Sequence, residues 1–188
     1  MEQEFLKDII CRLEASGATY AITGSVASNF WGIPRTTHDV DIVILLAVQE
    51  VDQIVARFAD RYYVSEPMVR EAALRYGMFN IIDFSTSLKA DFWVRGNDPF
   101  NQSMLSRRRR IEFVPGQEGY IGSAEDVLLH KLVWNTITPS ERQLADAAGI
   151  AAVQAGKLDQ AYLRQWAKAQ GTEALLEEVL QGKHLKHT

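Results

Sequence analysis

The sequence predicts an α/β fold in which a mixed β-sheet flanked by helices is followed by a C-terminal helical bundle. Short apolar or alternating runs are interleaved with segments of helical spacing as far as residue 122. Two of these runs, residues 78–84 and 88–94, are joined by Ser85-Thr86-Ser87, which is typical of an antiparallel hairpin. From Ser123 onward the apolar spacing becomes continuously helical.

The first half begins with apolar residues at helical spacing over residues 5–13, and Gly17 then supplies a helix stop. A strand over residues 20–22 follows, and Gly24-Ser25 turns the chain into a short helix over residues 26–31. An apolar second strand covers residues 40–46. We expect the remaining elements of this half to be helices at 51–58, 68–76 and 102–107 and a strand at 111–114.

The second half begins at Ser123, which can cap a helix because Asp126 follows three residues later. Helices are expected at residues 124–136, 140–155, 159–170 and 172–181. No Gly/Ser-rich linker separates the two halves. We therefore expect an α/β domain over residues 1–122 and a helical region over residues 123–188 that packs on it.

The composition is that of a globular protein, with 47% hydrophobic and 23% charged residues in 188. A net charge of -4 excludes a general attraction to nucleic acid, so a polyanion would need a local patch such as residues 107–110. The single cysteine, Cys11, excludes an internal disulfide and fits a reducing compartment. The acidic N-terminus and the short apolar runs predict a cytoplasmic protein with no membrane partner.

Two aspartates, Asp39 and Asp41, interrupt the apolar second strand. Because side chains alternate along a strand, both carboxylates lie on one face, about 7 Å apart along the backbone. At a separation of about 5 Å and an effective dielectric constant of about 20 they repel by roughly 3 kcal/mol, which a bound cation would remove. Asp91 falls on the polar face of the second hairpin strand. Three carboxylates are suitable ligands for Mg²⁺, with Mn²⁺ as the alternative metal. The other interpretation of the three acids is that they lie at exposed strand ends and are solvated by water.

Gly24-Ser25 lies where the first strand passes into a helix. Free amides and the positive end of the helix dipole make such a turn suitable for a phosphate, and glycine allows close approach. Small residues at strand-helix turns are also common for steric reasons alone, so the pair gains its weight from its spacing to Asp39 and Asp41.

Gly24-Ser25, the run Arg35-x-Thr37-x-Asp39-x-Asp41 and the later Asp91 together resemble the nucleotidyltransferase superfamily related to DNA polymerase beta. More narrowly, the chain is similar to the AbiEii-type group of bacterial nucleotidyltransferases. Residues 123–131, which end at Lys131, and the pair Arg142 and Asp146 resemble the helical lysine and Arg-x-x-x-Asp segments of that group. Thr23 stands where the family usually has a glycine. The resemblance covers roughly residues 18 to 150.

The resemblance implies transfer of a nucleoside monophosphate from a nucleoside triphosphate (NTP) to a hydroxyl, in a cleft between the two halves. Asp39 and Asp41 would hold Mg²⁺, and Asp91 would be the third ligand and help to activate the hydroxyl. The residues implied to bind the nucleotide are Gly24, Ser25, Arg35, Thr37, Lys131 and Arg142.

The implied acceptor is tRNA, as in toxin-like relatives, with an antitoxin as a partner. A small molecule such as an antibiotic and a protein hydroxyl are the alternative acceptors. A member of the fold that binds nucleotides or partners without catalysis is the rival from another class.

Several of these residues also have simpler interpretations. Lys131 can extend its stem along apolar neighbours, and Arg142 with Asp146 can form a helical ion pair. Arg35 and Thr37 can fix the loop before the second strand. Trp93 shares the face of Asp91 and could lie under a nucleobase, whereas tryptophans usually belong to the core. Acid–base roles for His38 and His130 have little support, because the sequence identifies no partner for either.

Overall fold

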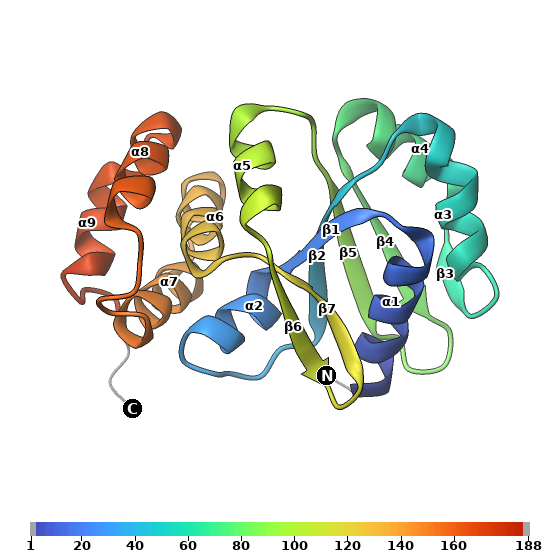
Figure 1. The fold of residues 1–188 in the computed structure, drawn as a ribbon, viewed down its shortest axis with the longest axis horizontal. Helices are drawn as coiled ribbons and strands as arrows, with labels where there is room; N and C mark the ends of the chain where they lie inside the picture. The colour runs from blue at the N-terminus through green and yellow to red at the C-terminus, as the bar shows by residue number, and fades with distance from the viewer. Residues whose placement is uncertain (1–2, 186–188) are drawn as a thin grey trace. The chain divides into compact units, whose positions relative to one another are not determined.

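The computed structural model describes residues 3–185, which form two compact units (Figure 1). The first unit comprises Met1–Thr23 and Thr36–Ile121, and the second comprises Gly24–Arg35 and Gly122–Thr188. The sequence predicted one division, at residue 122. The structure divides the chain at two further points, because residues 24–35 pack with the C-terminal helices of the second unit.

The first unit is built on a seven-stranded sheet with the strand order β3-β4-β5-β2-β1-β7-β6. The strands are β1 (Thr19–Thr23), β2 (Asp39–Leu45), β3 (Tyr62–Val64), β4 (Met78–Asp83), β5 (Lys89–Val94), β6 (Arg109–Val114) and β7 (Gln117–Ile121). β1 pairs with β2 antiparallel, while β2 pairs with β5 in parallel. The predicted mixed sheet is therefore confirmed.

The predicted antiparallel hairpin is also confirmed, because β4 pairs with β5 from Met78↔Trp93 to Ile82↔Lys89. Two strands were not predicted. β3 is only three residues long, and β7 contains a glycine and polar residues that hide its alternation. Both strands are defined by their pairing, β3 with β4 and β7 with β1 and β6.

One face of the sheet is apolar and lies under helices. Ile42 and Phe92 are register partners on this face and are fully buried. Phe58 packs edge-on against Phe92, with ring centroids 5.8 Å apart. Figure 1 shows α1, α3 and α4 grouped over this part of the sheet. The helical segments of the unit are α1 (Gln3–Ser16), η1 (Val48–Glu50), α3 (Val51–Phe58), α4 (Glu66–Arg75) and α5 (Pro99–Arg107).

The opposite face of the sheet is covered over one part by α5. Met104 and Leu105 of α5 are buried against Ala21 and Val43, and Trp93 packs at the edge of this cluster. In the register of β2 and β5, Trp93 lies beside Val43, one pleat further along than Asp41 and Asp91. The apolar contact with α5 is therefore made next to the acidic residues of the same face.

The second unit is helical, as the sequence predicted for residues after 122. Its helices are α2 (Gly24–Trp31), α6 (Ala124–Ile137), α7 (Glu141–Val153), α8 (Gln160–Gln170) and α9 (Glu173–Leu180). Ser123 caps α6 as predicted, since its hydroxyl accepts a hydrogen bond from the amide of Asp126 at 3.2 Å. None of the helices in the part of the chain that is described could cross a membrane, given their length and polarity.

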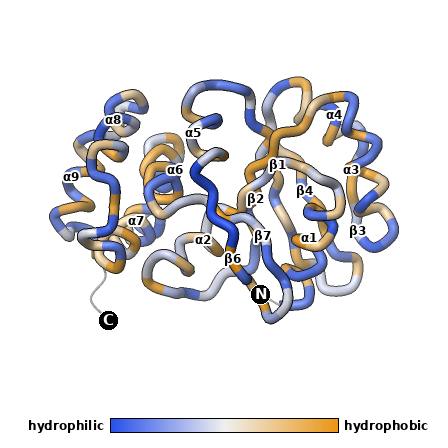
Figure 2. The backbone as a smooth tube through the Cα atoms, in the orientation of Figure 1, coloured by the Kyte–Doolittle hydropathy of each residue, from blue (hydrophilic) through white to orange (hydrophobic). Residues whose placement is uncertain are grey.

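β6 forms one edge of the sheet and begins with arginines, so its start is strongly hydrophilic in Figure 2. Arg110 forms ion pairs with Glu14 and Glu118 at 3.2 and 2.8 Å. Arg108 and Arg110 both lie over the ring of Tyr120, 4.4 and 5.3 Å from its centroid. Arg108 and Arg110 are thus engaged within the protein. Charged side chains on an edge strand also discourage pairing with another sheet.

Candidate functional site

Three carboxylates lie on the face of the sheet that α5 covers in part. Asp41 and Asp91 are register partners on β2 and β5, and Asp39 lies two residues before Asp41. Side chains of register partners point to the same face, so the alternation of β2 and β5 gathers all three residues. Asp39 is exposed, Asp41 is half-buried and Asp91 is buried, with 8% of its surface exposed. We call Asp39, Asp41 and Asp91 the acidic face.

Two neighbours on the same face hold these acids. The indole Nε1–H of Trp93 donates to Oδ1 of Asp41 at 3.3 Å, so Trp93 supports a carboxylate in addition to its core contacts. The ammonium of Lys89 lies 2.8 Å from Oδ2 of Asp91. The hydrogen bond to Asp91 raises the pKa of Lys89, and the charges of Asp91, Asp39 and Asp41 add to this effect.

The acidic face has the chemistry of a divalent-cation site. Oδ1 of Asp91 is buried and has no hydrogen-bond partner among the described residues, which is costly for a carboxylate oxygen. However, no three His, Cys, Asp or Glu side chains within residues 3–185 are arranged as a metal site. The three carboxylates therefore share a face, but they are not arranged as a complete set of metal ligands. One of their oxygens, Oδ2 of Asp91, is paired with Lys89.

The turn at Gly24-Ser25 belongs to the second unit. β1 ends at Thr23 and α2 begins at Gly24, whose φ of 59° is a conformation that favours glycine. Oγ of Ser25 accepts a hydrogen bond from Nη2 of Arg35 at 2.8 Å. The first turn of α2 is thus fixed by a residue of the loop that follows the helix.

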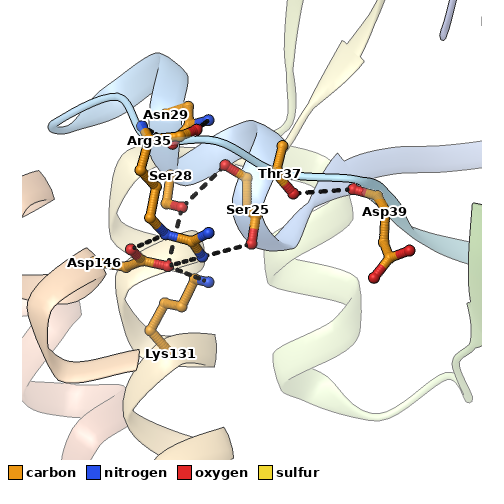
Figure 3. Close-up of polar contacts among 8 residues, drawn as sticks. All are labelled: Ser25, Ser28, Asn29, Arg35, Thr37, Asp39, Lys131 and Asp146. Carbon is orange, nitrogen blue, oxygen red and sulfur yellow. Dashed lines mark hydrogen bonds and ion pairs between the residues drawn. The ribbon is translucent and has the colours of Figure 1, made fainter. Parts of the chain in front are cut away.

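Asp146 gathers the basic residues of the second unit, as Figure 3 shows. Arg35 binds its carboxylate with two parallel bonds, Nε to Oδ1 and Nη2 to Oδ2, both at 2.8 Å. Nζ of Lys131 lies 2.8 Å from Oδ2, and the side chains of Lys131 and Asp146 are each only 6% exposed. We call Ser25, Arg35, Lys131 and Asp146 the Asp146 cluster.

The electrostatics of the cluster follow from this pairing. Burial alone would raise the pKa of Asp146, but the hydrogen bond from Arg35 and the charge of Lys131 outweigh it and lower that pKa. The hydrogen bond to Asp146 raises the pKa of Arg35. Asp146 is therefore an anion at neutral pH that holds two cations close to the first turn of α2.

Further hydrogen bonds hold the loop before β2. Nδ2 of Asn29 donates a hydrogen bond to the carbonyl oxygen of Arg35 at 2.6 Å, and Oδ1 of Asn29 accepts one from the Arg35 amide at 3.0 Å. Thr37 donates to the carbonyl of Asp39 at 3.4 Å. These contacts give Arg35 and Thr37 the structural task that the sequence allowed for them, and both also remain candidates for nucleotide binding.

Arg142 is not gathered into the cluster. It is exposed, and the helical ion pair with Asp146 that the sequence allowed is replaced by the pairs of Asp146 with Arg35 and Lys131. The alternative interpretation of Lys131, a lysine that only extends along apolar neighbours, is not what the structure shows, because its ammonium is paired. His38 is exposed.

Sequence reasoning missed Lys89, although a signal for it existed. Lys89 lies two residues before Asp91 and therefore on the same face of β5. The role of Asp146 had no such signal, because its partner Arg35 is 111 residues away in the chain.

Solved nucleotidyltransferase structures resemble this fold. The lincosamide antibiotic adenylyltransferase LnuA, solved with lincomycin bound, aligns with a TM-score of 0.57 and 13% identity over 81% of this chain and 98% of that protein. An antigenic nucleotidyltransferase-like protein from Paracoccidioides brasiliensis aligns with a TM-score of 0.55 and 18% identity over 100% of this chain and 96% of that protein. The antibiotic-resistance factor ANT(2'')-Ia aligns with a TM-score of 0.51 and 12% identity over 95% of this chain and 88% of that protein.

No protein-family model and no curated protein sequence matches the chain. The structural comparisons do not reach the AbiEii-type group, so that narrower resemblance stays a prediction. The mixed sheet flanked by helices and the C-terminal helices are consistent with a nucleotidyltransferase-like α/β fold. The chain therefore has the nucleotidyltransferase fold.

Proposed function

We propose that the protein transfers a nucleoside monophosphate from an NTP to a hydroxyl acceptor. The observation that carries the proposal is the acidic face, where three carboxylates share one side of a nucleotidyltransferase sheet and a buried oxygen of Asp91 has no partner among the described residues. Such a group of acids opposes folding by mutual repulsion unless a cation accompanies it.

In this proposal Asp39, Asp41 and Asp91 hold Mg²⁺ when the nucleotide binds. Bound there, Mg²⁺ would supply positive charge that polarises the phosphates and lowers the pKa of the acceptor hydroxyl. The acceptor oxygen forms a bond to the α-phosphorus, the bond from that phosphorus to the β-phosphate oxygen breaks, and pyrophosphate leaves. Asp91 is the candidate to receive the proton of the acceptor hydroxyl.

The triphosphate contacts that the resemblance implies are proposed residue by residue, and all of these residues except Thr37 belong to the second unit. Gly24 and Ser25 supply the first turn of α2, and Arg35 and Lys131 supply positive charge already gathered near it. Cations held in fixed positions stabilise developing negative charge without reorganisation during the reaction. Thr37 and the exposed Arg142 complete the set that we assign to the nucleotide.

For the acceptor we favour a small hydroxyl-bearing molecule over tRNA. Arg108 and Arg110, part of the one local basic run in the sequence, are engaged with Tyr120, Glu14 and Glu118 and do not form an open phosphate-binding strip. Of the structures that resemble this fold, one is an antibiotic adenylyltransferase and another is an antibiotic-resistance factor. The tRNA acceptor, the antitoxin partner and a protein acceptor remain predictions from the sequence.

The proposal is tested with α-labelled NTPs, Mg²⁺ and two acceptor pools, total RNA and a panel of hydroxyl-bearing antibiotics. We expect label in the small-molecule fraction together with released pyrophosphate. Label in tRNA-sized material would instead select the RNA acceptor. Absence of transfer and pyrophosphate release in every pool, with NTP binding retained, would select a non-catalytic protein.

Asp41→Asn is the variant that tests the metal. It removes one negative charge from the acidic face and should lower the transfer rate by about 100-fold or more, and it should abolish the dependence of NTP binding on Mg²⁺. Asp52→Asn is the matched control, because it makes the same charge change at a side chain that is 81% exposed. Unchanged Mg²⁺-dependent binding in Asp41→Asn would show that the metal is misassigned.

A further inference from the structure

Lys89 is a cation on β5, the strand that also carries Asp91 of the acidic face. It is the register partner of Asp39, and it precedes Asp91 by two residues, so its side chain rises from the same face of the sheet. Its ammonium lies 2.8 Å from Oδ2 of Asp91. The contact joins a lysine side chain that is 34% exposed to an aspartate side chain that is 12% exposed.

The ammonium reduces the repulsion within the acidic face. Three carboxylates carry three negative charges, and the ion pair compensates one of them where burial makes the charge most unfavourable, at Asp91. Asp39 and Asp41 also lie close enough for their charges to act on Lys89. A divalent cation bound to the same carboxylates would perform this compensation instead.

Lys89 and a divalent cation would compete for Asp91. Lys89 takes Oδ2 of Asp91, while Oδ1 is buried without a partner among the described residues. A divalent ion held by Asp91 and Asp41 would be repelled by an ammonium in hydrogen-bond contact with Asp91. Because Lys89 is partly exposed and has a flexible four-carbon stem, it can turn toward solvent.

We propose that Lys89 is the internal counter-ion of the acidic face, which holds Asp91 in the metal-free protein and is displaced when a divalent cation binds. This inference rests on the proposed function, because it takes the acidic face to be the metal site. Lys89 acts through Asp91 and is a positioning residue. It lowers the affinity for free Mg²⁺ while stabilising the metal-free state.

The test uses the full chain without nucleotide, with Mg²⁺ alone as the probe. Lys89→Met keeps an apolar stem of similar length and removes the charge. We expect it to lower the Tm measured in EDTA and to bind Mg²⁺ about tenfold more tightly by calorimetry, so that Mg²⁺ raises its Tm more than that of the wild type. Lys89→Arg keeps the charge and should behave like the wild type.

Lys7→Met is the matched control, because Lys7 is exposed on α1 and its loss changes the net charge equally. It should leave both the Tm and the Mg²⁺ affinity unchanged. If Lys89→Met does not fold, Lys89→Gln carries the same test with a polar stem.

Two results overturn the inference and differ in what they leave standing. If the wild type binds Mg²⁺ and Lys89→Met binds it equally or more weakly, Lys89 is no competitor, and the metal site remains. If neither protein binds Mg²⁺, the acidic face is not a metal site in the free protein and the role of Lys89 falls, whereas the metal assignment in the nucleotide-bound protein is decided by the Mg²⁺-dependent NTP binding of Asp41→Asn.

Discussion

At the scale of single residues, the geometry of Arg35 matters more than its charge. Its guanidinium makes two parallel bonds to Asp146 and a third to Ser25, each at 2.8 Å. An ammonium is a point donor and cannot span these three acceptors in the same way. Arg35→Lys should therefore lower the free energy of unfolding by about 1–3 kcal/mol, measured by urea denaturation.

Arg70→Lys is the control for this prediction. Arg70 pairs with Asp52 and Glu66, but its side chain is 38% exposed and its partners are more exposed still. Exposed ion pairs contribute little, so this change should stay within about 0.5 kcal/mol. Equal losses in Arg35→Lys and Arg70→Lys would mean that the bidentate bond to Asp146 adds nothing to stability.

At the scale of secondary-structure elements, α2 approaches the backbone of α7 at a glycine. A Cβ added at Gly32, just after α2, would lie 2.8 Å from the amide nitrogen of Ile150 and 3.0 Å from the carbonyl carbon of Gly149. Backbone atoms of a helix cannot turn aside as a side chain can. Gly32→Ala should therefore lower the free energy of unfolding by about 1–3 kcal/mol in urea, followed by circular dichroism.

The matched control is Gly77→Ala, at a position where the nearest atom to an added Cβ is 3.5 Å away. There the substitution should be neutral or slightly stabilising, because alanine restricts the unfolded chain. If Gly32→Ala were as harmless as Gly77→Ala, α2 and α7 would be more loosely packed than the structure shows.

The same scale shows what the sequence could and could not predict. Periodicity located α1, β2, the β4–β5 hairpin and the helices after residue 122, because each buries one regular face. It failed for β7, whose strand state comes from pairing with β1 and β6. In the site, alternation placed Asp39, Asp41 and Asp91 on one face, whereas the partners of Asp146 depend on tertiary packing that has no local pattern.

At the scale of the whole molecule, each unit contains a carboxylate that favours its ionised form. In the second unit this is Asp146. In the first unit, burial would raise the pKa of Asp83, but bonds from the Ser85 hydroxyl and amide and the Thr86 amide lower it to about 2. Both units therefore have a reason to lose stability in acid, on the same side of neutrality.

The sign follows from the direction of the pKa shifts. A carboxylate whose pKa is lower in the folded state binds fewer protons there than in the unfolded chain, so its contribution is complete above the unfolded pKa of 3.8. For Asp83 that contribution is about 2 kcal/mol, and it is lost as the pH falls from about 4 to about 2. The free energy of unfolding should be flat near neutrality and decline across this window.

Asp83→Asn tests this at the level of the whole pH curve. The variant should be less stable than the wild type by about 2 kcal/mol at pH 7, and the difference should shrink to about 0.5 kcal/mol or less near pH 2, where about half of Asp83 in the wild type is protonated. Urea denaturation at intervals between pH 7 and pH 2 measures both curves. Asp52→Asn, at a side chain that is 81% exposed, should run parallel to the wild type. A gap between Asp83→Asn and the wild type that stays constant down to pH 2 would show that the loss comes from packing, and that the charge of Asp83 does not contribute.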